Sequence, residues 1–460
     1  GCLTLPTISK LRLSTMWCAT IFATKPGPGK QTTTSAPGLD ESSDKSMLTS
    51  DDMMSHAHKT DITIGTSKEV EGVDQVDEGF RVHQLSPSSW NRYEQCPRKY
   101  WLSRQRLPRK ASMPAVVGNA VHNSVEDICN LDIDNREDDE VGWMPYTAKA
   151  ILDGHWNNEK VGFMATPRHP RWKDDLITQA HDGLVGALKI LCSKSLLPQT
   201  KLSELTISDW KYVQSLVLSN EGTLVSECGR LMGRLDLLVA DLDENGQSRG
   251  WIVADLKTGR PPTGALDPKV SRQLRFYRDL LKRNNSDHPP IRAEGWYSAN
   301  QTIHEATGDN VIDDAFVAWE GMRPSSEPLE ATPGERACGF CEWKAWCPAW
   351  WNATGEGTLS SSGAFRDEVV QIIRYDSEGG AGLLERMASV DESGNVSKSS
   401  KRFGFTVKDQ AKNQLDELFS DGYEGTLFIG SARVSSKVLH LGDWSEIIPW
   451  QPILENTMPV

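Results

Sequence analysis

Periodic spacing of apolar residues predicts three helices in the region from residue 81 to residue 352. The stretch "LSPSSWNRYEQCPRKYWLSRQ" places Ser86 where a helix N-cap is expected and Pro87 at the first helical position, and a periodic pattern follows. Further helices are predicted from about Val117 to Ile128 and from Val270 to Arg283, since apolar residues recur there every three to four positions.

Between these last two helices the pattern changes to strands. A helical, insertion-like region is expected through about residue 218, followed by two apolar runs of strand type around a polar turn at 243–246. The second run, "GWIVADLK", is rich in branched and aromatic residues, which suit a buried strand. Helices that flank a hairpin of strands predict an α/β fold for residues 81–352.

The two ends of the chain have different patterns. Residues 1–80 show little periodicity and are rich in small polar residues, which predicts a disordered extension. Residues 353–364 have the composition of a flexible linker. Residues 365–460 contain strand-like runs and one helical piece, and predict a small β-rich domain. A barrel of the oligonucleotide-binding (OB) kind and a packing or partner-binding module both fit this pattern.

Composition excludes some classes of protein. The chain has 460 residues and no run of eighteen apolar residues, so no membrane partner is expected. The net charge is −13, yet residues 96–110 hold six Lys or Arg and no acid, and residues 257–285 hold eight against two acids. These stretches fit either a focused surface for a polyanion or ordinary solvated helix faces. Nine cysteines, an odd number, favour a reducing compartment, so a cytoplasmic or nucleoid-associated protein is expected.

Two acids and a lysine interrupt the apolar strands. Asp255 and Lys257 lie two residues apart, so their side chains share one face of the strand. The turn at 243–246 would place Asp236 opposite residues 253–256 of the neighbouring strand. A surface ion pair is one explanation. Half of a metal-dependent hydrolytic site is the other, because a divalent cation relieves the repulsion between two adjacent carboxylates.

Further polar residues could complete such a site. On the helix "VVGNAVHNSVEDI", Glu126 lies four residues after His122 and so on the same face. Gln273 and Tyr277 have the same spacing on the helix that follows the Asp255 strand. Each pair alone is explained as well by a structural histidine or a solvated helix surface.

Together the motifs "VGNAVHNSVE", "GRLD", "DLK" and "QLRFY" resemble the PD-(D/E)XK nucleases, in particular their RecB-like branch, over roughly residues 85 to 350. The resemblance implies a restriction-endonuclease-like core, a central mixed sheet flanked by helices. It implies that Mg²⁺ or Mn²⁺ is bound by His122, Asp236, Asp255 and the main-chain oxygen of Leu256. Lys257 would assist the attacking water, Gln273 and Tyr277 would support the site, and Glu126 would lie just outside it.

Cysteines enclose these motifs. "CGFCEWKAWCP" holds Cys338, Cys341 and Cys347, and Cys96 lies far upstream. Three clustered thiols predict a soft-metal centre with a fourth ligand, and both iron–sulfur and structural zinc fit. The order resembles RecB-like nucleases with an iron–sulfur staple, such as AddB-type subunits and CRISPR-associated exonucleases, which implies a [4Fe–4S] cluster that joins both ends of the domain. Tryptophans nearby are expected to pack over it.

The predicted function is a metal-dependent DNA nuclease, expected to act as an exonuclease on single-stranded DNA or DNA ends in recombination or repair. Two alternatives stay open: a non-catalytic DNA-end-binding or scaffold subunit of a helicase–nuclease complex, and a CRISPR adaptation nuclease. No helicase motor motif is visible, so a separate helicase would have to unwind duplex DNA. The residues expected to contact DNA are Arg98, Lys99, Arg260, Arg272 and Arg275.

Overall fold

The computed structural model describes residues 83–197, 200–359, 363–391 and 393–455. The extension predicted for residues 1–80 lies outside the described residues. Within the described residues, none of the helices combines the length and the apolar character that a bilayer crossing requires.

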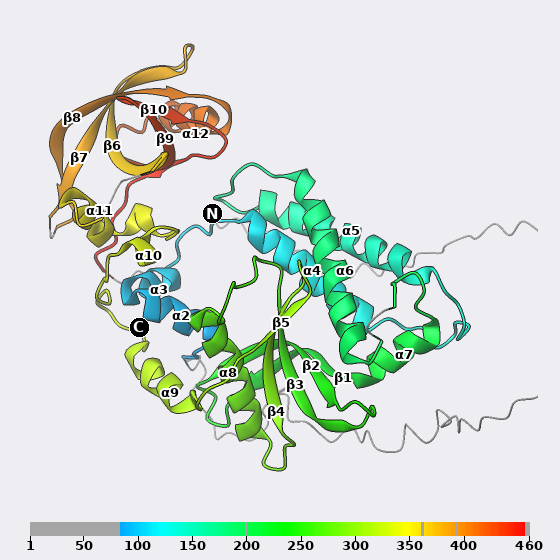
Figure 1. Ribbon diagram of the computed structural model, residues 1–460. Helices are drawn as coiled ribbons and strands as arrows, with labels where there is room; N and C mark the ends of the chain where they lie inside the picture. Colours follow the sequence, from blue (N-terminus) through cyan, green and yellow to red (C-terminus); the bar gives the residue numbers. More distant parts are fainter. Residues whose placement is uncertain (1–82, 198–199, 360–362, 392, 456–460) are drawn as a thin grey trace, which may run out of the picture. The chain divides into compact units, whose positions relative to one another are not determined.

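Five strands form a mixed sheet in the first part of the described chain (Figure 1). They are β1 (Val217–Val225), β2 (Met232–Leu242), β3 (Ser248–Lys257), β4 (Ile291–Tyr297) and β5 (Thr302–Glu305). Neighbours in the sheet follow the order of the sequence, and β3 and β4 run parallel while the other pairs are antiparallel. The predicted hairpin is confirmed as β2 and β3, whose turn is closed by the hydrogen bond from Gly246 N to Asp243 O at 3.0 Å.

Helices cover both faces of this sheet. They are α2 (Pro87–Gln95), α3 (Pro97–Arg104), α4 (Met113–Cys129), α5 (Trp143–Met164), the 3-10 turn η2 (Asp174–Leu176), α6 (Ile177–Lys194), α7 (Ile207–Leu216), α8 (Pro268–Asn284) and α9 (Ile312–Gly321). The helices predicted at Val117–Ile128 and Val270–Arg283 are confirmed as α4 and α8, whereas the first predicted helix is divided at the extended Cys96 into α2 and α3. At the start of α2, the Ser86 side chain accepts a hydrogen bond from Ser89 N, as its N-cap position predicts.

Two apolar cores lie on opposite faces of the sheet. Ile252, Ala254 and Leu256 belong to a core shared with α4, α5, α6 and α7. Val253 and Leu238 belong to the other core, with residues of α2, α8 and α9. Because neighbouring residues of β3 feed different cores, the strand is buried on both faces, and its polar residues come at its end.

A second sheet follows three short elements: α10 (Glu335–Cys338), the 3-10 turn η3 (Lys344–Trp346) and α11 (Pro348–Gly355). The linker predicted at 353–364 therefore begins inside a helix, and Leu359 is also buried against the tryptophans of α11. The strands of the second sheet are β6 (Phe365–Asp376), β7 (Ala381–Val390), β8 (Val396–Val407), β9 (Leu427–Ser435), β10 (Val438–Leu441) and β11 (Glu446–Pro449).

These strands close into a ring, which we call the barrel (residues 365–449). β10 pairs in parallel with β8 and antiparallel with β9, so the pairings run β6-β7-β8-β10-β9 and back to β6, while β11 adds to β9. The helix α12 (Asp409–Ser420) lies between β8 and β9 in sequence. Its Ala411 and Leu415 pack into the barrel core with Phe405.

Candidate active site and cysteine cluster

The two predicted acids lie opposite each other where β2 and β3 pair. Leu237 is the partner of Ala254 in this antiparallel ladder, so the next position places Asp236 opposite Asp255 on the same face. Oδ2 of Asp236 also accepts a hydrogen bond from Leu256 N at 2.7 Å. The side chain of Asp255 is 3% exposed, so it is an acid in the protein interior.

His122 reaches the same point from α4. Its Nδ1 lies 3.4 Å from Oδ1 of Asp236, and its Nε2 lies 2.9 Å from the main-chain oxygen of Leu256. Gly118, one turn before His122, lies beside Thr258, where a Cβ would make an ordinary contact at 3.6 Å. Burial alone would lower the pKa of His122, but the hydrogen bond and the charge of Asp236 outweigh it and raise the pKa from 6.5 to about 9.

Lys257 and residues of the helix α8 complete the group of side chains around Asp255. Nζ of Lys257 lies 2.5 Å from Oδ2 of Asp255. Gln273 donates from Nε2 to Oδ1 of Asp255 at 2.8 Å, and its Oε1 accepts from Lys257 Nζ at 3.4 Å. The hydroxyl of Tyr277 accepts a hydrogen bond from Gln273 at 3.2 Å. The structure therefore brings the predicted metal ligands, Lys257, Gln273 and Tyr277 to one place, although Asp255 is not in the described group of donor atoms that lies within 4.8 Å.

Burial governs the charge state of Asp255. Loss of solvent raises its pKa from 3.8 to about 6, the positive charge of Lys257 opposes that rise, and the nearby Asp236 adds to it. Burial likewise raises the pKa of Tyr277. A divalent cation bound beside Asp255 would favour the ionised form of this carboxylate.

Glu221 on β1 is a site residue that the sequence reasoning missed. One donor atom each from Glu221, His122 and Asp236 lie within 4.8 Å of one another, the spacing of a possible metal site. The backbone of Glu221 has φ +50°, a left-handed conformation that residues other than glycine rarely adopt. The carboxylate of Glu221 pairs with Arg234. Burial and Asp236 raise the pKa of Glu221, and Glu126 adds to this effect. β1 pairs with the strand that contains "GRLD", but the sequence pattern did not predict a strand at Glu221, so it gave no direct signal for this residue.

Carboxylates, a main-chain oxygen and an imidazole are ligands that suit Mg²⁺ or Mn²⁺. The acids face one another across the β2–β3 pair, and Asp236, Glu221 and His122 lie within reach of one ion. The residues present therefore fit a divalent cation.

The four predicted cysteines lie in one neighbourhood. Cys96 occupies the single position between α2 and α3, Cys338 ends α10, and Cys347 precedes α11. Cys347 interacts electrostatically with Cys341 and Cys96, and Cys338 with Cys96. Burial raises the pKa of Cys347 to about 12, which disfavours a thiolate unless a positive charge is bound beside it. Four thiols near one another are a donor set that suits a soft metal, but their sulfur atoms are not among the groups of donor atoms that lie within 4.8 Å of one another in the described residues.

The five residues predicted to contact DNA lie in different environments. Arg98 is half-buried and donates to Leu329 O at 2.6 Å. Lys99 donates to Gln95, Arg272 donates to Asn91 and lies over the ring of Trp90, and Arg275 donates to Asp309 O. Arg260 lines an open hollow with Asp267 and Tyr297, beside the end of β3. Of the five, Arg260 lines this hollow, while the others have protein partners.

Comparison with known proteins supports one family. A search of curated protein sequences finds no match to this chain. The family model of the PD-(D/E)XK nuclease superfamily matches residues 84–348, which include α2, the mixed sheet and all the site residues described above. With more than half of its length matched, the chain belongs to the PD-(D/E)XK nuclease superfamily.

Proposed function

We propose that this protein is a metal-dependent deoxyribonuclease of the RecB-like branch, an exonuclease that acts on single-stranded DNA or on DNA ends in recombination or repair. The observation that carries the proposal is the contact set at the end of β3, where Lys257 meets the buried Asp255 and where Asp236 meets His122. Membership of the superfamily supports phosphodiester hydrolysis. Unwinding of duplex DNA would need a separate helicase.

Each side chain has a distinct task in this proposal. Asp236, Asp255, His122 and the oxygen of Leu256 hold the cation, with Glu221 as a further ligand. Bound Mg²⁺ or Mn²⁺ would supply Lewis-acid activation of water and neutralise charge on the phosphate. Lys257 holds a fixed positive charge beside the reacting phosphate and orients the attacking water. Gln273 holds Lys257 and Asp255 in position through a hydrogen bond to each, and its hydrogen bond to Tyr277 fixes the orientation of its own side-chain amide.

We also propose a [4Fe–4S] cluster at Cys96, Cys338, Cys341 and Cys347. It would join α2 and α3 to the segment that follows the nuclease motifs, closing a long loop of the unfolded chain. Zinc is the competing metal, and the two differ in colour and in metal content.

We also propose an OB-like fold for the barrel. Its closed ring of five strands, with a helix between the third and fourth of them, supports this proposal, and β11 is an additional strand. This proposal concerns the fold of the barrel, and the nuclease chemistry does not depend on it.

A cleavage assay on end-labelled DNA tests the function. Wild-type protein should degrade single-stranded DNA with Mg²⁺ or Mn²⁺ and not with EDTA, and labels at the 5′ or the 3′ end should reveal polarity. Lys257→Ala should abolish cleavage and retain DNA binding in Ca²⁺. Lys269→Ala, an exposed change on α8, is the matched control and should cleave normally. Equal cleavage by Lys257→Ala would end the assignment, while DNA binding without wild-type cleavage would favour the scaffold alternative.

A further inference from the structure

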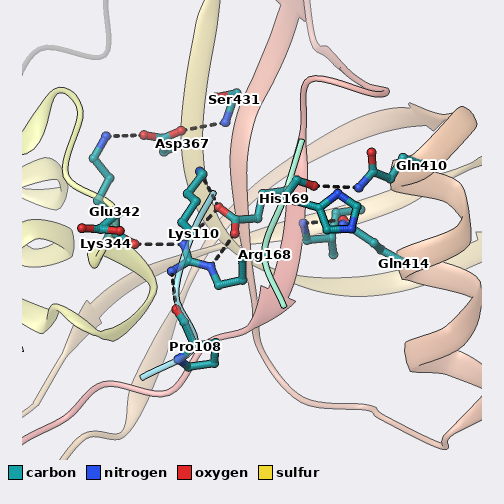
Figure 2. A network of polar contacts seen from close by, with 12 residues as sticks. Pro108, Lys110, Arg168, His169, Glu342, Lys344, Asp367, Gln410, Gln414 and Ser431 are labelled. Atoms are coloured by element: carbon teal, nitrogen blue, oxygen red, sulfur yellow. Dashed lines mark hydrogen bonds and ion pairs between the residues drawn. The ribbon is translucent and has the colours of Figure 1, made fainter. Parts of the chain in front are cut away.

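The segment Cys338–Cys347, which we call the cysteine loop, carries three of the four clustered thiols and is held by the barrel. Lys344 in this loop is 7% exposed. Its ammonium donates to Gly339 O at 2.9 Å and pairs with Asp367 of β6. Asp367 in turn accepts a hydrogen bond from Ser431 N at 2.7 Å, so the lysine is anchored to two strands of the barrel (Figure 2).

Arg168 makes a second connection, and its side chain is 5% exposed. It donates to Glu342 O of the cysteine loop at 2.9 Å and to Pro108 O at 3.2 Å. It also pairs with Glu446 of β11 at 2.6 Å and lies 4.7 Å from the ring centre of Trp346. One buried cation thus joins the loop after α5, the segment after α3, the cysteine loop and the barrel.

Main-chain and apolar contacts add to these ion pairs. Beyond β11 the chain runs beside the cysteine loop, where Gln451 N donates to Ala345 O at 3.3 Å and Ile453 N to Trp346 O at 3.0 Å. A shared apolar core joins tryptophans of the loop and of α11 to the barrel residues Val369, Met387, Val390, Phe428 and to Trp450. The second half of the loop, residues 343–347, is therefore packed against the barrel and the segment that follows it.

The composition of the barrel does not favour a nucleic-acid surface. Residues 365–460 contain ten Lys or Arg against fifteen Asp or Glu. A surface that binds a polyanion is typically basic. The contacts that distinguish the barrel are those with the cysteine loop.

We infer that the barrel is a clamp that fixes the cysteine loop, so that retention of metal by the four thiols depends on barrel docking. The inference rests on the four-thiol centre proposed above. In the docked state Lys344 and Arg168 are buried beside the carboxylates of Asp367 and Glu446, and loss of either carboxylate would leave a buried charge without its partner and so weaken docking. Docking of the barrel and binding of metal by the four thiols both order the cysteine loop. Each therefore raises the equilibrium constant of the other by the same factor.

Barrel-side variants of the full chain test this clamp without changing the cysteine loop. Asp367→Asn keeps the oxygen that accepts from Ser431 N and removes the negative charge that faces Lys344. Glu446→Gln removes the negative charge that faces Arg168. Asp367→Glu restores the charge. Tyr375→Phe is the control, because it removes a barrel contact with Asp416 on α12. The readouts are iron and zinc per chain, absorbance near 400 nm and the rate of metal loss to a chelator.

Asp367→Asn and Glu446→Gln should lose metal roughly tenfold faster than wild type, the scale of coupling between neighbouring groups. Tyr375→Phe and Asp367→Glu should resemble wild type. In the reciprocal experiment, Cys341→Ser should be cut faster than wild type by a protease near residues 356–364. Equal rates of metal loss in all variants, or equal proteolysis of Cys341→Ser, would overturn the clamp alone. A wild type without iron or zinc would remove the proposed centre and the clamp with it, and neither result depends on nuclease activity.

Discussion

Nε2 of His122 lies 2.9 Å from the main-chain oxygen of Leu256. Two adjacent ligands of an octahedral ion with bonds of about 2.1 Å are separated by about 3.0 Å, so this spacing suits a shared cation. A proton on Nε2 gives the same distance through a hydrogen bond, while Nδ1 faces Asp236. A proton and a metal ion therefore compete for one position.

This competition predicts a pH dependence. The pKa of His122 is raised from 6.5 to about 9, so the protonated ring contributes stability that is complete below pH 6.5 and is lost as the pH rises to about 9. Melting temperatures in EDTA should fall over this window, while the gain in melting temperature from Mn²⁺ should grow, because the metal needs the neutral ring. His122→Gln should flatten both trends. An unchanged slope in this variant would exclude the histidine as the source.

Glu221 should affect metal binding more than folding. Glu221→Gln keeps the size of the side chain and removes its charge, so we expect affinity for Mn²⁺ to fall by roughly 10–100-fold. Calorimetric titration of the wild type and of the variant measures the change. Glu244→Gln, in the exposed turn between β2 and β3, is the control and should bind normally. Equal affinities would place Glu221 outside the metal site.

Variants of α8 should show graded losses of cleavage. Gln273→Ala removes contacts with both Asp255 and Lys257, so we expect cleavage to slow by roughly 10–100-fold, as for groups that orient metal ligands. Tyr277→Phe removes one contact, with Gln273, and should have a smaller effect. Single-turnover rates on labelled single-stranded DNA give the order. A larger loss in Tyr277→Phe than in Gln273→Ala would contradict it.

Gly186 on α6 should be intolerant of any side chain. A Cβ there would lie 1.9 Å from Ser298 O, and Ser298 N donates to the carbonyl of Lys257 at 3.0 Å. Gly186→Ala should therefore destabilise the protein by about 1–3 kcal/mol, as overpacking does. Gly162 on α5 has open space around it, and Gly162→Ala should be neutral or stabilising by up to about 1 kcal/mol. Chemical denaturation of both variants provides the test.

The nuclease motifs were readable from the sequence because each combines a local element with an unusual residue. Asp236 and Asp255 interrupt apolar strands around an evident turn, so strand geometry predicted that Asp236 lies opposite residues 253–256, and the structure fixes the register that pairs it with Asp255. His122 and Gly118 share a helix face, which the one-turn spacing reveals. The resemblance to a known family supplied the remaining connection, between α4 and the strand end.

Other features depend on contacts that sequence spacing does not encode. Glu221 lies on β1, which the pattern hid because the strand follows α7 directly and is only partly buried. The small, polar composition of residues 353–364 predicts a linker, yet burial of Ala353 and Leu359 against aromatic rings extends ordered structure into it. Arg168 carries no local signal, since its partners lie up to 278 residues away.

That separation has a consequence for how the protein is made. Arg168 leaves the ribosome 278 residues before Glu446, which corresponds to roughly 14–56 s at about 5–20 residues per second. During that interval the nuclease sheet can form, but Arg168 does not yet have the carboxylate of Glu446 as its partner. Translation must therefore proceed to β11 before the catalytic half of the polypeptide reaches its final packing, and pauses upstream would prolong a vulnerable nascent state.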